Sequence, residues 1–172
     1  IWGFTISLGG NIAVNYYMVL DDKVLEDENA KMVFTVPDTG SVYTQEIPVS
    51  DAEINGKFHI FTCEVAAKEI TSDILCQIVT ETDESDTFTY SVKEYADVIL
   101  ANADVYGTAV PLVKTMLNYG ANAQVYFNHN LDKLANDSDY ITEEEKLLPE
   151  ELDLSSFEMS VEGEEEGIFY YG

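Results

Sequence analysis

The stretch TFTYSVKEYADVIL, residues 87–100, contains the point at which the hydrophobic pattern of the chain changes. Before Tyr90, apolar and polar residues alternate in short segments, which is typical of β-strands with one buried face. From Ser91 to about Phe127, apolar residues recur every three to four positions, which is typical of amphipathic helices. The change of period predicts an α+β fold, in which an antiparallel β-sandwich is followed by a small α-helical cluster.

Seven short alternating segments precede the change of period, and turn residues such as Asn55-Gly56 separate them. Strands and turns at this spacing favour a sandwich of two antiparallel sheets. The glycines of Gly9-Gly10-Asn11 predict a hairpin between the first two strands. We expect strands at residues 4–8, 12–20, 32–36, 42–49, 58–65, 74–80 and 87–91.

The second of these segments, residues 12–20, is largely apolar on both faces. One face carries Val14 and Tyr16, and the other carries Asn15 and Tyr17. A strand with two apolar faces is usually covered on both sides. We therefore expect the sister sheet to cover one face and the downstream helices to cover the other.

Two helices are predicted after the strands. The sequence Ser91-Val92-Lys93-Glu94 has the form of a capping box and predicts the start of the first helix. Residues 102–107 end it, and a second helix opens around Thr108 to Pro111 with a proline in its first turn. Gly120 leaves open whether this is one bent helix or two short ones. The expected apolar face of the second helix comprises Leu112, Val113, Met116, Leu117, Gly120, Ala123, Gln124 and Phe127.

The same patterns divide the chain into three parts. We expect the sandwich over residues 1–90, the helical cluster packed on it over residues 91–140, and an acidic C-terminal extension or the start of another module over residues 141–172. Thr142 precedes three glutamates and predicts a capped helical turn. Residues 168–171 predict a last strand or the beginning of the next module. The start at Ile1 favours a piece of a larger multidomain protein.

The charge of the chain restricts its partners. It carries 33 acidic residues and 8 lysines, no arginine, and a formal net charge of −25. A nucleic acid partner is excluded, because phosphate binding requires clustered cations. Anionic membrane surfaces are disfavoured for the same reason, and no apolar run is long enough to span a bilayer. A neutral ligand suits this chain better than an anionic one.

The cysteines and histidines indicate no catalytic or metal site. Cys63 and Cys76 would lie opposite each other if their segments paired as a hairpin, which permits a disulfide, but two free buried thiols are the better interpretation. His59 lies on the polar phase of its strand. Neither His59 nor His129 has a nucleophile or ligand partner at a suitable spacing.

Carboxylates are too abundant to indicate an active site. Among 33 acidic residues, some pair will meet the spacing of a glycosidase by accident. Two acidic segments, residues 21–28 and 132–139, lack the calcium-binding EF-hand pattern and are better interpreted as solvated loops. We expect no enzyme activity, no cofactor and no metal.

Aromatic and amide residues suggest a sugar site. Tyrosine rings offer flat faces to the C–H surface of a sugar, and asparagines offer a donor and an acceptor to its hydroxyls. The alternative is that the tyrosines only pack the helices on the sandwich. Trp2, the only tryptophan, is the best single stacking candidate. The predicted ligand-binding residues are Trp2, Asn15, Tyr17, Tyr119, Asn122 and Tyr126.

Four segments carry a resemblance to a known kind of module: GGNIAVNYYMVL (9–20), IFTCEVAAKEI (60–70), YSVKEYADVILAN (90–102) and PLVKTMLNYGANAQVYF (111–127). They resemble a sandwich-plus-helices module of secreted surface proteins of anaerobic gut bacteria. One such module is the starch-binding first domain of an amylosome starch adherence system protein. The resemblance covers about residues 4–136 and rests mostly on structural positions.

The resemblance implies a function that composition and spacing do not. It implies a secreted or cell-surface, non-catalytic module that binds starch and malto-oligosaccharides, both neutral polysaccharide ligands, between the sandwich and the helices. It identifies no sugar-contacting residue. Many similar modules have no assigned ligand, so a structural or adhesive surface module with a protein partner is the alternative.

Overall fold

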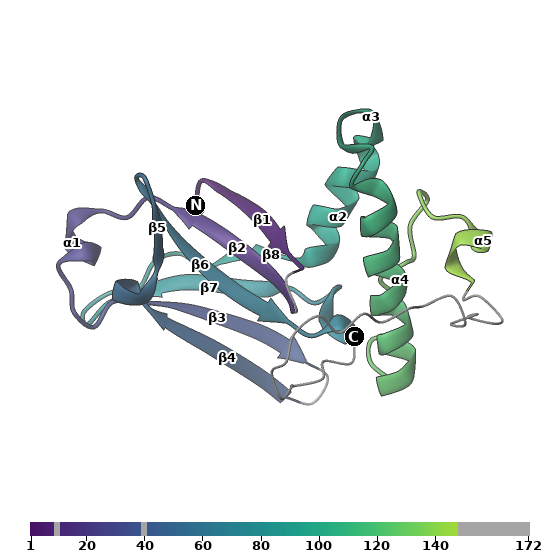
Figure 1. Cartoon of the computed structure of the whole chain (residues 1–172). Coiled ribbons are helices and arrows are strands. Elements are labelled where there is room, and N and C mark those ends of the chain that lie inside the picture. The colour runs from purple at the N-terminus through teal and green to yellow at the C-terminus, as the bar shows by residue number, and fades with distance from the viewer. Residues whose placement is uncertain (9–10, 39–40, 148–172) are drawn as a thin grey trace, which may run out of the picture.

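The computed structural model describes residues 1–8, 11–38 and 41–147 and shows an α+β fold (Figure 1). The strands of these parts form two four-stranded antiparallel sheets. The first sheet has the order β1 (Gly3–Ser7), β2 (Ile12–Met18), β6 (Phe58–Val65) and β5 (Glu53–Asn55). The second has the order β4 (Ser41–Pro48), β3 (Lys31–Asp38), β7 (Ile74–Val79) and β8 (Phe88–Tyr90).

The helices are α1 (Asp22–Leu25), α2 (Val92–Ala101), α3 (Ala103–Tyr106), α4 (Val110–Phe127) and α5 (Glu143–Lys146). Two short 3₁₀ turns, η1 (Val49–Asp51) and η2 (Ala67–Glu69), lie between strands. The expectation that all helices follow the strands is wrong, because α1 lies between β2 and β3. Asp21 begins α1 by accepting a hydrogen bond from the backbone N–H of Val24 at 3.0 Å.

All seven predicted strands are present, and the structure adds an eighth. The additional strand, β5, has only three residues and pairs with one edge of β6. A segment this short shows no hydrophobic period, which is why alternation did not reveal it. The predicted turn at Asn55-Gly56 is confirmed, since Gly56 has a φ of 62° and connects β5 to β6.

Side chains from both sheets form one buried cluster. The ring of Tyr16 on β2 lies 4.9 Å from the ring of Phe34 on β3, measured between centroids. The ring of Phe4 on β1 stacks 4.2 Å from that of Tyr90 on β8. The cluster continues into the helices through residues such as Leu117. One continuous apolar core therefore holds both sheets and the helices together.

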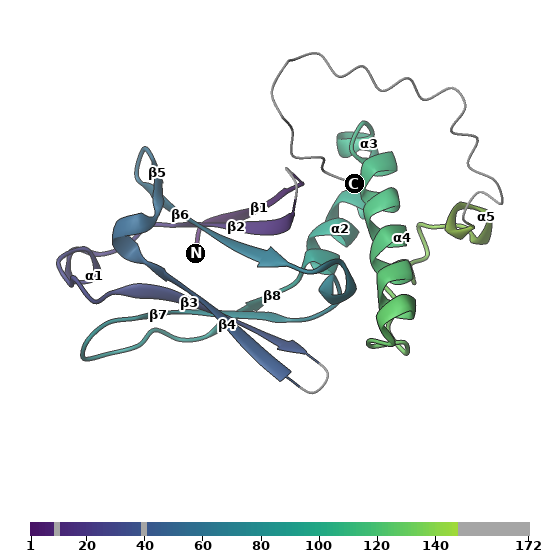
Figure 2. The same cartoon turned by 60° about the horizontal axis from the view of Figure 1, so that its bottom comes forward.

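The helices α2 and α4 stand at one end of the sheets (Figures 1 and 2). Helix α4 packs mainly against η2, in the connection from β6 to β7, and against α2. The expectation that helices cover the outer face of β2 is wrong. Asn15 and Tyr17 on that face are half-buried and lie among side chains of neighbouring strands. The polar atoms of this face bond to one another, so it needs no helix over it.

Helix α2 begins where the sequence predicts. The Ser91 hydroxyl accepts from the backbone N–H of Glu94 at 3.1 Å, and the Glu94 carboxylate accepts from the backbone N–H of Ser91 at 2.8 Å. Helix α4 is continuous over 18 residues and has no break at Gly120. Its buried face differs from the predicted one at its ends, because Leu112 and Phe127 are exposed.

Gly120 allows α4 to approach η2 closely. A Cβ at this position would lie 2.5 Å from Cδ1 of Ile70 and 3.1 Å from both Cβ of Ala135 and the backbone oxygen of Ala67. The Cβ of Ala135 and the backbone oxygen of Ala67 cannot move away by a side-chain rotation. The close contact between helix and sheet connection therefore requires glycine here.

Gly120→Ala is expected to destabilise the protein. Overpacking typically costs about 1 to 3 kcal/mol, and the better helix propensity of alanine returns only about 1 kcal/mol. The net loss, up to about 2 kcal/mol, would appear in the free energy of unfolding from urea denaturation. Asn122→Ala, at an exposed position of α4, is the matched control and should change stability by less than about 0.5 kcal/mol. A stabilised Gly120→Ala protein would contradict the close approach.

The segment after α4 ends in the capped turn that the sequence predicts. The Thr142 hydroxyl accepts from the backbone N–H of Glu145, and the Glu145 carboxylate accepts from the backbone N–H of Thr142 at 2.9 Å. The Lys114 ammonium on α4 lies 2.7 Å from the Glu145 carboxylate and holds α5 against α4. This hydrogen bond from Lys114 lowers the pKa of Glu145 below its usual value. The strand predicted at residues 168–171 lies outside the described residues.

Candidate functional site

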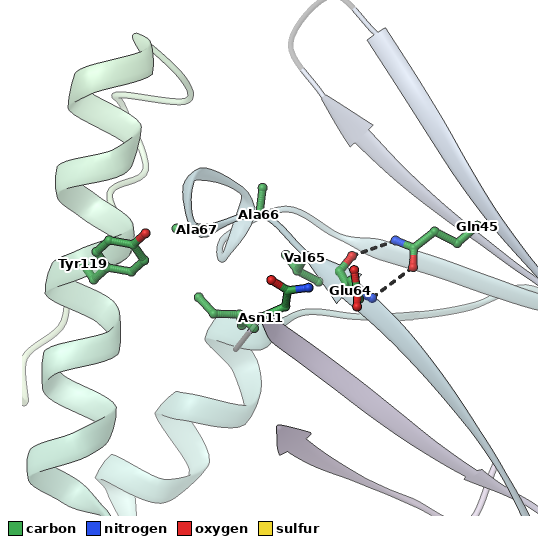
Figure 3. A pocket seen from close by; sticks show the side chains of 8 residues that line it. Asn11, Gln45, Glu64, Val65, Ala66, Ala67 and Tyr119 are labelled. Carbon is green, nitrogen blue, oxygen red and sulfur yellow. Dashed lines mark hydrogen bonds between the residues drawn. The ribbon is translucent and has the colours of Figure 1, made fainter. Parts of the chain in front are cut away.

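A groove of about 550 Å³ lies where the ends of the sheets meet α4 (Figure 3). The start of β2, the end of β6, β4 and η2 form one wall, and α4 forms the other. The groove therefore lies at the seam between sheets and helices. The lining residues are Asn11, Ile12, Gln45, Glu64, Val65, Ala66, Ala67 and Tyr119.

Gln45 connects the two sheets on the floor of this groove. Its side-chain nitrogen donates to the backbone oxygen of Glu64 at 2.7 Å, and its side-chain oxygen accepts from the backbone N–H of Glu64 at 3.0 Å. These two bonds join β4 of the second sheet to β6 of the first. The amide of Gln45 is consequently held in one orientation beside the groove.

Tyr119 supplies the aromatic wall of the groove. It projects from α4 towards the side that carries Asn11 and η2 (Figure 3). Its side chain is 64% exposed, so one ring face is open to solvent. An open ring opposite the amides of Asn11 and Gln45 offers apolar contact and hydrogen bonds without a net positive charge. Such a lining suits an uncharged polyhydroxylated ligand.

The structure does not bring the six predicted site residues together. Tyr119 lines the groove, whereas Asn122 and Tyr126 share its exposed stripe of α4 but do not line it. Asn122 donates to the backbone oxygen of Asn118 at 2.8 Å, and Tyr126 is 83% exposed beside Phe127. The remaining three, Trp2, Asn15 and Tyr17, lie at the first sheet.

Three polar groove residues were missed by sequence reasoning: Asn11, Gln45 and Glu64. Asn11 directly precedes β2, and the other two lie on strands far apart in the sequence. Alternation indicates that a strand residue points outward but not which other strand end lies beside it. No sequence signal could have placed these residues opposite Tyr119.

A second cluster lies on the outer face of the first sheet, and we call it the Trp2 patch: Trp2, Tyr17, Lys57 and Phe58. The rings of Trp2 and Phe58 lie 5.7 Å apart, and those of Tyr17 and Phe58 lie 6.2 Å apart edge to face. The Lys57 ammonium stands 4.4 Å from the centre of the Trp2 ring. Trp2 is nevertheless 69% exposed.

The cysteines are free and buried, as favoured from the sequence. The hairpin arrangement considered for them is wrong, because Cys63 lies on β6 of the first sheet and Cys76 on β7 of the second. Burial raises the pKa of Cys63 to about 12 and that of Cys76 to about 11. Thiols with raised pKa values are poor nucleophiles at neutral pH.

The histidines are structural in character. The prediction that His59 lies on the polar phase of its strand is wrong, since it pairs with Met18 and shares the phase of buried Phe61. His129 is buried in the turn after α4, where its backbone N–H donates to Gln124. Neither side chain lines the groove.

The acidic segment at residues 21–28 has structural partners. Besides Asp21, which caps α1, Asp27 accepts hydrogen bonds from the backbone N–H groups of Asn29 and Glu81. Within residues 1–8, 11–38 and 41–147, no group of three or more His, Cys, Asp and Glu side chains could hold a metal ion.

No helix in the described parts of the chain combines the length and the apolar character that crossing a membrane requires. Comparisons with protein-family models, with curated proteins and with solved structures found no match to this chain.

Proposed function

We propose that this chain is a non-catalytic starch-binding module of an extracellular protein. In this proposal, the two sheets form a β-sandwich, and the groove between it and α4 holds an α-glucan or malto-oligosaccharide. The observation that carries the proposal is that the exposed Tyr119 lines the groove on α4, while Asn11 and Gln45 line its opposite wall.

The chemistry of the groove supports a neutral ligand. Its lining contains apolar side chains, two amides, a tyrosine and the carboxylate of Glu64, and no lysine. A phosphorylated or acidic ligand would meet an unfavourable field from a chain with a net charge of −25. An uncharged glucan avoids this repulsion and matches the hydroxyl, amide and ring groups that are present.

The lining also supports binding rather than hydrolysis. Glycoside hydrolysis normally requires two carboxyl groups on opposite sides of the scissile bond. Among the residues that line the groove, Glu64 is the single carboxylate. A sugar bound there would meet one carboxylate of the lining, whereas an acid–base or nucleophilic mechanism normally uses two.

Replacing Tyr119 tests the groove. Loss of a stacking ring is expected to weaken binding of maltoheptaose by roughly five- to 150-fold, by analogy with aromatic stacking on nucleic acid bases. Because Tyr119 is largely exposed, Tyr119→Ala should melt within a few degrees of the parent protein. Calorimetric titration measures the affinity, and retardation in a native gel containing amylopectin extends the result to the polymer.

Tyr126→Ala is the matched control, because Tyr126 lies on the same helix and is even more exposed but does not line the groove. It should bind maltoheptaose as the parent does. Equal affinity in the parent and Tyr119→Ala would place the sugar elsewhere. Absence of any retardation in amylopectin would overturn the proposed function.

A structural or adhesive module with a protein partner is the second candidate. The observation that favours it is the row of exposed apolar residues at the end of α4, Val125, Tyr126 and Phe127. Exposed apolar surface of this kind is common at protein interfaces. This function would be preferred if the chain bound no polysaccharide while substitutions at Tyr126 and Phe127 abolished attachment to a protein partner.

A further inference from the structure

We infer that the Trp2 patch is a second saccharide-binding site, separate from the groove, that takes the flat C–H face of an uncharged pyranose ring. The patch lies on the first sheet, at the end opposite to α2 and α4 (Figure 1). None of its four residues lines the groove. Its occupancy would therefore be independent of Tyr119.

The tryptophan is held in place before any ligand arrives. Its backbone N–H donates to the backbone oxygen of Tyr17 at 2.7 Å, which continues the pairing of β1 with β2 by one residue. Contacts of its ring with Phe58 and the Lys57 ammonium restrict its orientation. A ring fixed on a sheet loses little conformational entropy when it stacks on a ligand.

Space for a ligand is open beside the rings. Gly3 is the cross-strand partner of Tyr17, and no heavy atom of any residue other than Gly3 and its chain neighbours Trp2 and Phe4 lies within 4 Å of the position of a Cβ on Gly3. The glycine leaves the surface next to Tyr17 flat instead of covering it with a side chain. Together with the exposed indole of Trp2, this makes a shallow platform rather than a pocket.

Hydrogen-bonding groups continue from the platform along the same face. The Asn15 amide donates to the Thr5 hydroxyl at 3.2 Å, and the Thr62 hydroxyl donates to the Asn15 side-chain oxygen at 2.8 Å. Asn15 lies two residues from Tyr17, a separation of about 6.8 Å along a strand. The hydroxyl oxygens of Thr5 and Thr62 and the amide oxygen of Asn15 have further lone pairs that can accept hydrogen bonds from sugar hydroxyls.

The chemistry of the patch favours a neutral sugar over other occupants. Its only charged member is Lys57, whose ammonium can donate to a hydroxyl, and the chain has no arginine to clamp an anionic group. Rings beside uncharged amides and hydroxyls match a pyranose, which has an apolar face and a polar rim. Malto- and cello-oligosaccharides share this chemistry, so both must be tried.

The fluorescence of Trp2 reports ligand binding at the Trp2 patch, because Trp2 is the only tryptophan in the chain. Titration of the full chain with maltoheptaose, and separately with cellohexaose, should change the tryptophan emission in a saturable way with at least one sugar. The change should persist in Tyr119→Ala. Trp2→Ala should weaken calorimetric binding at this site by roughly five- to 150-fold, whereas Trp2→Phe should retain most of it.

The outcomes separate the two sites. If Trp2→Ala removes all binding while Tyr119→Ala has no effect, the Trp2 patch is confirmed as a binding site and the groove is excluded as one. If Tyr119→Ala removes all binding and neither sugar changes the tryptophan emission of the parent, the Trp2 patch is excluded as a binding site and the groove is supported. If neither sugar changes the tryptophan emission and Trp2→Ala binds as the parent does, the second site does not exist. A melting temperature of Trp2→Ala equal to that of the parent would show that any loss of affinity comes from the binding site and not from a loss of folded protein.

Discussion

Gln124→Leu is expected to lower the free energy of unfolding by at least about 1 to 3 kcal/mol, because it leaves the buried backbone N–H of Ala135 without its hydrogen-bond acceptor. Gln124 is fully buried on α4. Its side-chain oxygen accepts from the backbone N–H of Ala135 at 2.7 Å, and its side-chain nitrogen donates to the backbone oxygen of Lys133 at 3.0 Å. Leucine fills the space but replaces neither bond.

The amide of Gln124 also forms a hydrogen bond with the connection between β6 and β7. Its nitrogen lies 3.2 Å from the Thr71 hydroxyl, just after η2, so a single side chain joins α4, the segment that follows it and the sheet connection. Urea denaturation monitored by circular dichroism measures the loss. Val125→Leu, at the next and exposed position, should change stability by no more than about 0.5 kcal/mol. A Gln124→Leu protein that unfolds at the same urea concentration as the parent would show that these bonds contribute little.

Alkaline pH is expected to destabilise the protein steeply. Burial raises the pKa of Cys63 from 9.0 to about 12 and that of Cys76 from 9.0 to about 11. The folded protein therefore keeps both thiols protonated at pH values where the unfolded chain has lost those protons. This stabilisation is complete below pH 9 and is lost as the pH rises towards 11 for Cys76 and 12 for Cys63. Each thiol should contribute a slope of about −1.4 kcal/mol per pH unit in this range.

Urea denaturation at several pH values between 8 and 11 measures the slope. Cys63→Ala and Cys76→Ala should each be less stable than the parent at pH 8, because a cavity remains, but each should lose stability less steeply above pH 9. Burial raises the pKa of Tyr16 as well, so the double variant should keep some pH dependence above pH 10. Variants whose slopes equal that of the parent would show that the thiols do not cause the effect.

Local structure was largely predictable from local sequence. The capping boxes at Ser91 and Thr142 involve residues three apart, so each motif contains all the atoms that define its helix start. Strands β6 and β7 follow alternation, because side chains that point to the core must recur at every second residue. The exceptions were elements of three or four residues, β5, α1 and α3, which are too short to show a period, and α3 lies where the sequence predicted only the end of a helix.

The candidate site was much less predictable. Tyr119 was identified from a tyrosine and asparagine stripe, but the same stripe also suggested Tyr126, which lies outside the groove. Tyr17 was expected to face the helices, and it instead lies on the first sheet in the Trp2 patch, with its ring against that of Phe58. A pattern of types and spacings indicates which residues share a face and does not indicate what lies opposite that face.

The amino-acid sequence by itself determined seven of the strands, the two main helices, the inward residues of most strands and the start of α2, because each depends on contacts within a few residues. Its charge predicts a neutral partner. Only the tertiary structure decided that β6 and β7 belong to different sheets, which separates Cys63 from Cys76 as strand partners. It also placed Gln45 beside Glu64 and Tyr119 across from both. These relations depend on which sheet each strand joins and on the close packing of α4 at Gly120. Both are determined by contacts and hydrogen bonds between segments that are far apart in the sequence.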